Sequence, residues 1–242
     1  MQTDITELKK KAAAHAVGLI ASGMVVGLGH GSTAIHAVHF LAERLKSGEI
    51  KNVLGIPCSL QVEEEALQCG MPLTTFEKHP LMDITIDGAD EVDIELNLIK
   101  GGGGALLREK IVAQASRRVV IVLDESKCSP FLGKQRHVPV EIVPFGWNTH
   151  VFFLESLGAK VRIRRNADKS LYHTDQGNLI ADCNFNEILN PRELAAIIKT
   201  HAGVVEHGLF LDLATDVVIA GAGGVRHLKR DRPAPAGKGD IE

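Results

Sequence analysis

Aromatic side chains are scarce in this chain of 242 residues, at 4% of the sequence, with one tryptophan and one tyrosine. Proteins that hold single-stranded nucleic acid stack its bases on repeated aromatic rings, so the sequence does not favour that function. The formal net charge of −3 supplies no basic field that would attract a polyanion. We therefore expect no nucleic-acid partner.

Long apolar runs and paired cysteines are also missing. No run approaches the roughly 18 apolar residues that a membrane span needs, and the first residues, MQTDITELKKK, lack the apolar core of a signal peptide. The four cysteines have neither a C-x-x-C spacing nor a zinc-type spacing from a histidine pair. We expect reduced, mostly buried thiols, no metal site, no membrane association and a cytoplasmic location.

Apolar runs of strand length alternate with helical patterns through the first half of the chain. Asp4 and Glu7 indicate a helix start, with its end at Gly23 and an apolar face at Leu8, Ala12, His15 and Leu19. Strands are predicted at residues 24–28, 52–56, 83–86 and 117–123, and helices from Ser32 and over residues 59–68. Strands that are apolar on both faces and separated by helices indicate a parallel sheet covered on both sides.

The order of elements changes from about Lys134. Strands are predicted at residues 139–143, 160–165, 179–183 and 204–210, and helices at residues 147–157 and 191–203. This β-α-β-β-α-β order is typical of a small ferredoxin-like domain. We predict an α/β protein: a Rossmann-like parallel sheet domain (residues 1–133 and 206–228), an inserted smaller α+β ferredoxin-like lid domain (residues 134–205) and a disordered tail (residues 229–242).

A glycine-rich segment, residues 27–34 (GLGHGSTA), lies between a predicted strand and a predicted helix. Its glycines let the backbone turn sharply, so that amides at the helix start can face a phosphate, and Ser32 and Thr33 add hydroxyl donors. A tight turn with Ser32 as the helix cap is the alternative. A dinucleotide fingerprint would need glycine where Ser32 stands, and a triphosphate loop would end in Gly-Lys-Ser/Thr, so neither fits.

An acidic segment, residues 86–93 (IDGADEVD), follows a strand at the end where open α/β sheets bind ligands. Its four carboxylates repel one another unless cations or substrate hydroxyl groups satisfy them. A calcium loop does not fit, because Ala89 stands at a ligand position and the required glycine is misplaced. A solvated acidic turn is the alternative.

Four consecutive glycines, Gly101–Gly104, follow Lys100. The run is costly because glycine loses more backbone entropy on folding than any other residue. A flexible linker does not suit a run between a strand-like segment and a helix, so close approach of the backbone to a ligand explains it better. In the helix that follows, Leu106, Leu107, Ile111 and Val112 are expected to form the buried side.

Glu109 lies one turn into that helix, near the glycines. A solvated surface position is the alternative for an isolated helical glutamate. Together the segments supply a phosphate cradle, carboxylates for hydroxyl groups, a cation and a carboxylate base. An aldose–ketose isomerase needs these parts, because a base moves a proton between C2 and C1 while donors hold the enediolate oxygens.

Several motifs in the same order resemble those of the type A ribose-5-phosphate isomerase family: GHGST, DGADE, KGGG, REK, DESK and VPVE. The resemblance runs from about Lys9 to Leu228. It implies interconversion of D-ribose 5-phosphate and D-ribulose 5-phosphate in the non-oxidative pentose phosphate pathway, without a cofactor. It also implies a small phosphorylated sugar as the substrate and a homo-oligomer, usually a dimer or a tetramer.

The resemblance assigns a role to individual residues. Glu109 corresponds to the proton-transferring base, Asp87 to a group that assists ring opening or proton relay, and Lys100 to the group that stabilises the oxyanion. The substrate-binding residues correspond to His30, Gly31, Ser32, Thr33, Asp87, Gly88, Ala89, Asp90, Lys100, Gly101, Gly102, Gly103 and Lys127. His30 departs from the family, which commonly has threonine or serine there, so a hydroxyl contact is lost.

Two other functions share features with this pattern. Some bacterial repressors use a similar fold as a non-catalytic sugar-phosphate sensor, but they need a DNA-binding module, and no helix-turn-helix pattern precedes residue 24. Lys100 and Glu109 also favour catalysis. An acyl-CoA transferase relative would be larger and would leave the phosphate-type loop beside the acidic segment unexplained.

Overall fold

The computed structural model describes residues 4–230, which form two compact units. Unit 1 comprises residues 4–88, 108–126 and 212–230, and unit 2 comprises residues 89–107 and 127–211. Each unit contains its own sheet, so the predicted combination of a Rossmann-like sheet with a smaller α+β fold is confirmed. The exact predicted domain boundaries stay a prediction. Of the predicted tail, Lys229 ends a strand, and residues 231–242 lie outside the described residues.

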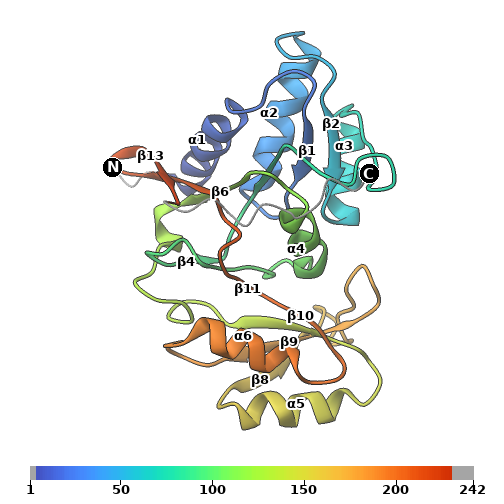
Figure 1. Cartoon of the computed structure of the whole chain (residues 1–242), viewed down its shortest axis with the longest axis vertical. Helices are drawn as coiled ribbons and strands as arrows, with labels where there is room; N and C mark the ends of the chain where they lie inside the picture. Colours follow the sequence, from blue (N-terminus) through green and yellow to red (C-terminus); the bar gives the residue numbers. More distant parts are fainter. Residues whose placement is uncertain (1–3, 231–242) are drawn as a thin grey trace, which may run out of the picture. The chain divides into compact units, whose positions relative to one another are not determined.

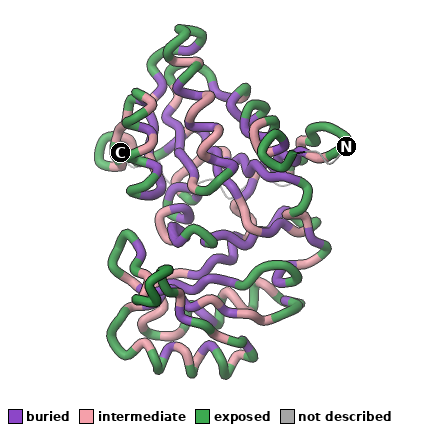
Figure 2. Tube along the Cα trace, turned by 180° about the vertical axis from the view of Figure 1, so that it is seen from behind, coloured by how far each residue is buried: buried purple, intermediate pink, exposed green. Residues whose placement is uncertain are grey.

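Unit 1 is built on a six-stranded sheet in the order β13-β12-β6-β3-β1-β2 (Figure 1). Its helices and strands are α1 (Ile5–Val17), β1 (Val25–Leu28), α2 (Ala34–Lys46), β2 (Leu54–Pro57), α3 (Leu60–Gln68), β3 (Ile84–Asp87), β6 (Val119–Asp124), β12 (Asp216–Gly221), β13 (Gly224–Lys229) and most of α4 (Leu106–Gln114). All neighbouring strands run parallel except β13, which pairs antiparallel with β12. The central strands are buried along their length, as Figure 2 shows.

Helices cover both faces of this sheet. Val26 and Leu28 of β1 join a core that α1 and α2 complete, and those two helices lie side by side in Figure 1. Val25 faces the opposite way and packs with Val112 of α4. The alternation follows from the two-residue period of a strand. The parallel pairing of β1 with β3 places the carboxyl ends of both strands at one edge of the sheet.

The first helix differs from the prediction. It ends at Val17 with Gly18 as its C-cap, rather than at Gly23. Its buried face is Leu8, Ala12, Ala13, Ala16 and Val17, whereas His15 is exposed. The alanines of α1 are small and pack closely. The buried face of the helix therefore lies beside the predicted face, which was inferred from more widely spaced apolar positions.

Unit 2 contains a four-stranded antiparallel sheet in the order β10-β7-β9-β8. Its helices and the strands of this sheet are β7 (Val138–Ile142), α5 (Trp147–Ser156), β8 (Lys160–Ile163), β9 (Leu179–Asn184), α6 (Pro191–Lys199) and β10 (Val204–His207). The short helix η1 (Glu125–Lys127) precedes them, and its first two residues belong to unit 1. Numbered within the motif, this is the order 4-1-3-2 that the predicted β-α-β-β-α-β sequence gives in a ferredoxin-like fold.

The single strand predicted over residues 204–210 is divided in the structure. β10 ends at His207, and β11 (Leu209–Phe210) joins β4 (Glu91–Val92) and β5 (Leu98–Ile99) in a separate three-stranded sheet. Gly208 allows the change, because a side chain there would overlap the carbonyl oxygen of Lys100. The short strand β4 and the exposed β13 were not predicted, whereas β5 corresponds to the strand-like segment expected before the glycine run.

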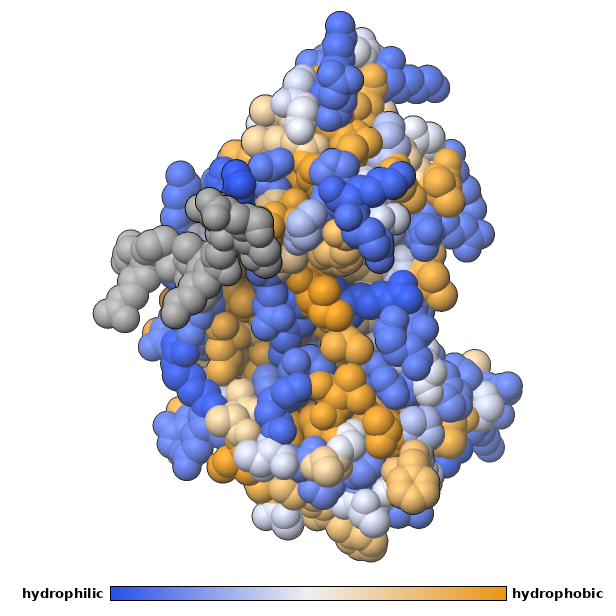
Figure 3. Space-filling model, turned by 45° about the vertical axis from the view of Figure 1, so that its right-hand side comes forward, coloured by the Kyte–Doolittle hydropathy of each residue, from blue (hydrophilic) through white to orange (hydrophobic). Residues whose placement is uncertain are grey.

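None of the described helices is long and apolar enough to cross a membrane. On the face of the molecule that Figure 3 shows, hydrophobic side chains alternate with hydrophilic ones.

A partly buried ion-pair network lies near β12 in unit 1. Arg118 donates two hydrogen bonds to the carboxylate of Asp216, at 2.7 and 2.9 Å, and His227 Nε2 lies 2.7 Å from the same carboxylate. Burial by itself would raise the pKa of Asp216, but the hydrogen bonds from Arg118, Thr215 and His227 outweigh it and lower that pKa to about 2. Because the ordinary value is 3.8, the ionised carboxylate stabilises the fold above about pH 4.

We predict that Asp216→Asn lowers the free energy of unfolding by about 2 kcal/mol at pH 7. The difference between wild type and variant should shrink as the pH falls from about 4 toward 2, because the wild-type carboxylate then takes up a proton. Urea unfolding followed by circular dichroism from pH 7 to pH 3 measures both quantities. A difference that stays constant over this range would show that the ionised form of Asp216 is not what stabilises the unit.

Candidate active site

The glycine-rich loop and the first acidic residue meet at the carboxyl edge of the unit 1 sheet. Asp87 ends β3, and its Oδ1 atom accepts hydrogen bonds from the backbone amides of His30 at 2.9 Å and Gly88 at 2.7 Å. The Asp87 side chain is 2% exposed, so these amides replace the water it has lost. Gly29 is required by this contact, because a Cβ atom at that position would overlap the Asp87 side chain.

The hydroxyl groups of this loop point to different surroundings. Thr33 is buried and stands at the N-cap of α2, although its side chain makes no capping hydrogen bond. Ser32 is exposed, and its Oγ atom accepts a hydrogen bond of 2.9 Å from Lys9 Nζ. The alternative interpretation of Ser32 as an ordinary helix cap is therefore wrong.

Lys9 was not among the predicted site residues. It lies on α1, 23 positions before Ser32 in the sequence, and only the packing of α1 beside α2 brings its ammonium group to the loop. A lysine beside a row of backbone amides is a common partner for a phosphate group. The preceding pattern of charges, Lys9-Lys10-Lys11, gave no reason to single out one of the three.

The imidazole of His30 is held by the start of α3. Its Nδ1 atom lies 3.0 Å from the hydroxyl oxygen of Ser59, which also accepts a hydrogen bond from the amide of Val62 as the N-cap of α3. Since that hydroxyl accepts from the helix, it can donate its own proton to His30 Nδ1, which leaves the proton of a neutral ring on Nε2. The residue that departs from the family pattern is thus fixed by a hydrogen bond of its own.

The four carboxylates of the acidic segment separate into two kinds. Glu91 is fully buried, and its oxygens accept hydrogen bonds from the amides of Gly133, Gln135 and Arg136. Asp93 accepts from the amides of Glu95 and Asn97 and closes a turn. These two carboxylates hold the fold of unit 2, so the predicted cluster reduces to Asp87 and Asp90.

Asp90 and the glycine run meet within unit 2. Asp90 Oδ2 accepts a hydrogen bond of 2.7 Å from the amide of Gly102, and a Cβ atom at Gly102 would lie 2.7 Å from Asp90 Oδ1. The run is therefore ordered by close approach to a carboxylate, which agrees with the prediction that it is no linker.

Arg164 orders the other side of the glycine run and was also missed. Its guanidinium donates to the carbonyl oxygens of Gly101 and Gly102, at 3.0 and 3.1 Å, and forms a two-pronged ion pair with Asp182. Tyr172 adds a weaker hydrogen bond to the carbonyl oxygen of Gly103. From the sequence, Arg164 was one of several basic residues on a half-exposed strand, without a signal that distinguished it.

The two predicted lysines differ in burial. Lys100 is 2% exposed, its amide donates to the carbonyl oxygen of Gly208, and its Nζ atom lies 5.6 Å from the centre of the Phe210 ring. Lys127 is half-buried at the end of η1. A buried lysine keeps a strong field in its surroundings because little water screens the charge.

Glu109 is 3% exposed in the first turn of α4, so the alternative of a solvated surface position is wrong. Val112, one turn later on the same helix face, is buried in the core of unit 1 and lies under Gly27. The predicted buried side of α4 needs a correction, because Leu107 is half-buried and Ile111 is exposed. Glu109 is thus part of the buried side of α4, where the apolar pattern had predicted Ile111.

The predicted site residues are thus carried by both units. Unit 1 holds His30, Gly31, Ser32, Thr33, Asp87, Gly88 and Glu109, and unit 2 holds Ala89, Asp90, Lys100, Gly101, Gly102, Gly103 and Lys127. Within unit 1 the structure brings the glycine-rich loop to Asp87. Within unit 2 it brings Asp90 to the glycine run.

Comparison with known proteins decides the family. Residues 54–224 match the family model of ribose 5-phosphate isomerase A (phosphoriboisomerase A). A ribose-5-phosphate isomerase A from Chloroflexus aurantiacus is 52% identical over 229 residues, which cover 94% of this chain and 96% of that protein. The chain belongs to the ribose 5-phosphate isomerase A family.

Solved ribose 5-phosphate isomerases have the same fold. The enzyme from Plasmodium falciparum is 41% identical, with a TM-score of 0.91 over 94% of this chain and 100% of that chain. A D-ribose-5-phosphate isomerase in complex with phospho-erythronic acid is 37% identical, with a TM-score of 0.92 and the same coverage. The fold of the ribose 5-phosphate isomerase A family thus extends over nearly the whole chain.

The close approach of Gly29 to Asp87 gives a testable prediction for this member of the ribose 5-phosphate isomerase A family. We expect Gly29→Ala to lower the free energy of unfolding by about 2 kcal/mol or more, because the added methyl group must displace Asp87 from the amides of His30 and Gly88. Gly223→Ala is the control, since no atom lies within 4 Å of a Cβ there, and its effect should be about 0.5 kcal/mol or less. Equal effects in a urea titration would argue against a tight contact at Gly29.

Proposed function

We propose that the chain interconverts D-ribose 5-phosphate and D-ribulose 5-phosphate as an aldose–ketose isomerase of the non-oxidative pentose phosphate pathway. The observation that carries the proposal is the burial of one carboxylate, Glu109, and one lysine, Lys100, in a chain 52% identical to a ribose-5-phosphate isomerase A. The complex of a relative with phospho-erythronic acid supports it. That ligand joins a phosphate to a planar carboxylate, which has the shape and charge of an enediolate.

In the proposed reaction Glu109 is the base. It removes the proton from C2 of the open-chain aldose, and the electrons of the C–H bond form the enediolate while the C1 carbonyl oxygen becomes negative. A proton moves from O2 to O1, the same carboxyl group returns its proton to C1, and the ketose is formed. Burial suits this role, because a carboxylate with little water around it is a stronger base than one in solution.

Lys100 and Asp87 act on the oxygens in this proposal. The ammonium group of Lys100 stabilises the negative charge that develops on the enediolate, and low exposure keeps that interaction strong. Asp87 assists ring opening or relays a proton between O1 and O2. Its two backbone amide donors hold the carboxylate in one orientation, so it can act without first changing its rotamer.

The remaining predicted residues would bind the substrate. The segment from His30 to Thr33, at the start of α2, suits a phosphate group through the amides of Gly31, Ser32 and Thr33 and the two hydroxyls, while the His30 amide donates to Asp87. Lys9 adds a positive charge beside Ser32. We assign the sugar hydroxyl groups to the segments 87–90 and 100–103. Lys127 is assigned to the sugar or its phosphate.

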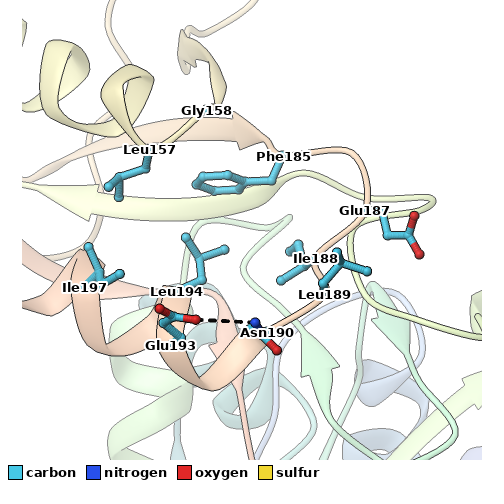
Figure 4. Close-up of a pocket in the computed structure, with 10 residues that line it drawn as sticks. All are labelled: Leu157, Gly158, Phe185, Glu187, Ile188, Leu189, Asn190, Glu193, Leu194 and Ile197. Atoms are coloured by element: carbon cyan, nitrogen blue, oxygen red, sulfur yellow. Dashed lines mark hydrogen bonds between the residues drawn. The ribbon is translucent and has the colours of Figure 1, made fainter.

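We also propose a cytoplasmic location and assembly into a homo-oligomer, a dimer or a tetramer. None of the four cysteines, all of which lie in the described part of the chain, forms a disulfide, which suits a reducing compartment. Unit 2 exposes Phe145, Phe152 and Leu189, and Leu189 lines a pocket of about 360 Å³ together with Leu157 and Phe185 (Figure 4). Exposed apolar side chains of this size favour a protein contact. Light scattering of the purified chain tests the assembly, and a monomer would contradict it.

The main prediction concerns Glu109. With D-ribose 5-phosphate as substrate and EDTA present, the wild type should form ketopentose, and Glu109→Gln should lower kcat by about a thousandfold or more because an amide cannot take the proton. Glu155→Gln, an exposed glutamate on α5, is the matched control and should keep full activity.

The outcomes distinguish the isomerase from the non-catalytic sensor and test the role of Glu109. If the wild type binds the sugar phosphate without turnover, the non-catalytic sensor replaces the isomerase. If both variants are as active as the wild type, the reaction stands and Glu109 is not its base.

Lys9 is predicted to affect substrate binding rather than chemistry. Lys9→Met should raise KM for D-ribose 5-phosphate by roughly tenfold or more, because one charge-assisted contact to the phosphate is lost, while kcat changes little. Lys10→Met removes a neighbouring lysine that pairs with Glu7 instead, and it should leave KM within about twofold of the wild type. Steady-state kinetics of the two variants test this prediction. Equal KM values would show that Lys9 does not contribute to binding of the substrate phosphate.

A further inference from the structure

Three side chains that commonly bind metal ions converge on the surface of unit 1, on helices that carry none of the predicted site residues. His39 comes from α2, and Glu65 and Cys69 come from the last turns of α3. His39 Nε2 lies 2.5 Å from Glu65 Oε1, and the ligand atoms of all three residues lie within 4.8 Å of one another. Glu65 and Cys69 are four positions apart, so they share one face of α3, and this face is turned toward α2.

The spacing suits a tetrahedral ion. With bonds of about 2.0–2.3 Å, the ligands of a tetrahedral zinc ion are roughly 3.5 Å apart. The three residues are half-buried, with side-chain exposures of 40% for His39 and 34% for Glu65, so small rotamer changes can close the remaining gap. The partial exposure also leaves a fourth position open to water.

The donor set selects the class of metal. An imidazole nitrogen, a carboxylate oxygen and a thiolate sulfur together suit Zn²⁺ and ions that resemble it, whereas Mg²⁺ and Ca²⁺ prefer oxygen ligands alone. The spacing of the cysteines in the sequence had suggested no metal site. The three ligands of this candidate site come from two helices, so no local spacing connects them. The geometry therefore departs from the expectation that the chain has no metal site.

The charges around the thiol also favour a cation. Burial raises the pKa of Cys69, and the carboxylates of Glu65 and Glu43 raise it further. Glu43 lies one turn after His39 on α2, so both helices contribute a negative charge. A divalent cation would be attracted by the same carboxylates that disfavour the bare thiolate.

We propose that His39, Glu65 and Cys69 form a binding site for a zinc ion, which ties α2 to α3. The site is separate from the proposed isomerase chemistry, so failure of one proposal leaves the other standing. A bound ion would stabilise unit 1, because it would bind the folded state and not the unfolded chain. It would tie α2, which begins at the glycine-rich loop, to α3, which begins at the Ser59 cap that holds His30.

The test uses the full chain without an affinity tag, stripped with EDTA and desalted. Zn²⁺ is titrated against a chromophoric chelator, and Co²⁺ is used as a spectroscopic substitute. We expect one equivalent of tightly bound metal and, with Co²⁺, a sulfur-to-metal charge-transfer band. Cys69→Ser should abolish this band, and Cys69→Ser and His39→Gln should each weaken Zn²⁺ binding by roughly tenfold or more.

Two control variants show whether these three residues are responsible. Cys128→Ser changes the other half-buried cysteine, and Glu64→Gln changes the carboxylate next to Glu65. Both should keep the wild-type affinity. Saturating Zn²⁺ should raise the Tm of the wild type by roughly 3 °C, and the Tm of Cys69→Ser should not respond.

The opposite results would overturn the proposal. Unchanged Zn²⁺ affinity in Cys69→Ser, or loss of the cobalt band in Cys128→Ser rather than Cys69→Ser, would place the metal elsewhere. Absence of stoichiometric binding to the folded wild type would mean that His39 and Glu65 form an ordinary surface ion pair. Circular dichroism of every variant shows whether it is folded.

Discussion

The buried carboxylate of Asp87 is the contact on which the candidate site of unit 1 depends. It ends β3, accepts the amide protons of His30 and Gly88, and lies so close to Gly29 that no side chain fits there. A buried carboxylate requires such donors, because it has given up its hydration. The glycine-rich loop is therefore shaped by its neighbour in the sheet as well as by its own sequence, and the parallel pairing of β1 with β3 brings the two together.

In unit 2, charged side chains likewise hold a glycine-rich backbone segment, the run Gly101–Gly104. The glycine run exposes amides and carbonyls with no side chains of its own to fix them. Asp90 accepts from one of its amides, and Arg164 donates to two of its carbonyls while Asp182 holds the guanidinium in place. A planar guanidinium can bind both oxygens of a carboxylate and two carbonyl oxygens at once, whereas a lysine ammonium group has only three N–H donors for those four acceptors. The entropic cost of ordering glycine is offset by these fixed partners.

The sequence predicted the fold best where strands are buried on both faces. The segments near β1, β3 and β6 stood out because a parallel strand between helices is apolar throughout. The exposed edge strand β13 has no such pattern and was missed. The end of α1 was placed too late, since Gly18 closes the helix before the later glycine, and the division between β10 and β11 depends on pairing with separate sheets.

The sequence by itself determined the order of elements, the two glycine-rich loops, the acidic segment between them and the family resemblance, because each depends on residues close together in the chain. Tertiary structure decided which of those residues are available for chemistry. It assigned Glu91 to a structural role, buried Glu109, and brought Lys9 and Arg164 to loops far away in sequence. Local spacing records which side chains share a strand or a helix face, whereas contacts between distant segments exist only after the chain has packed.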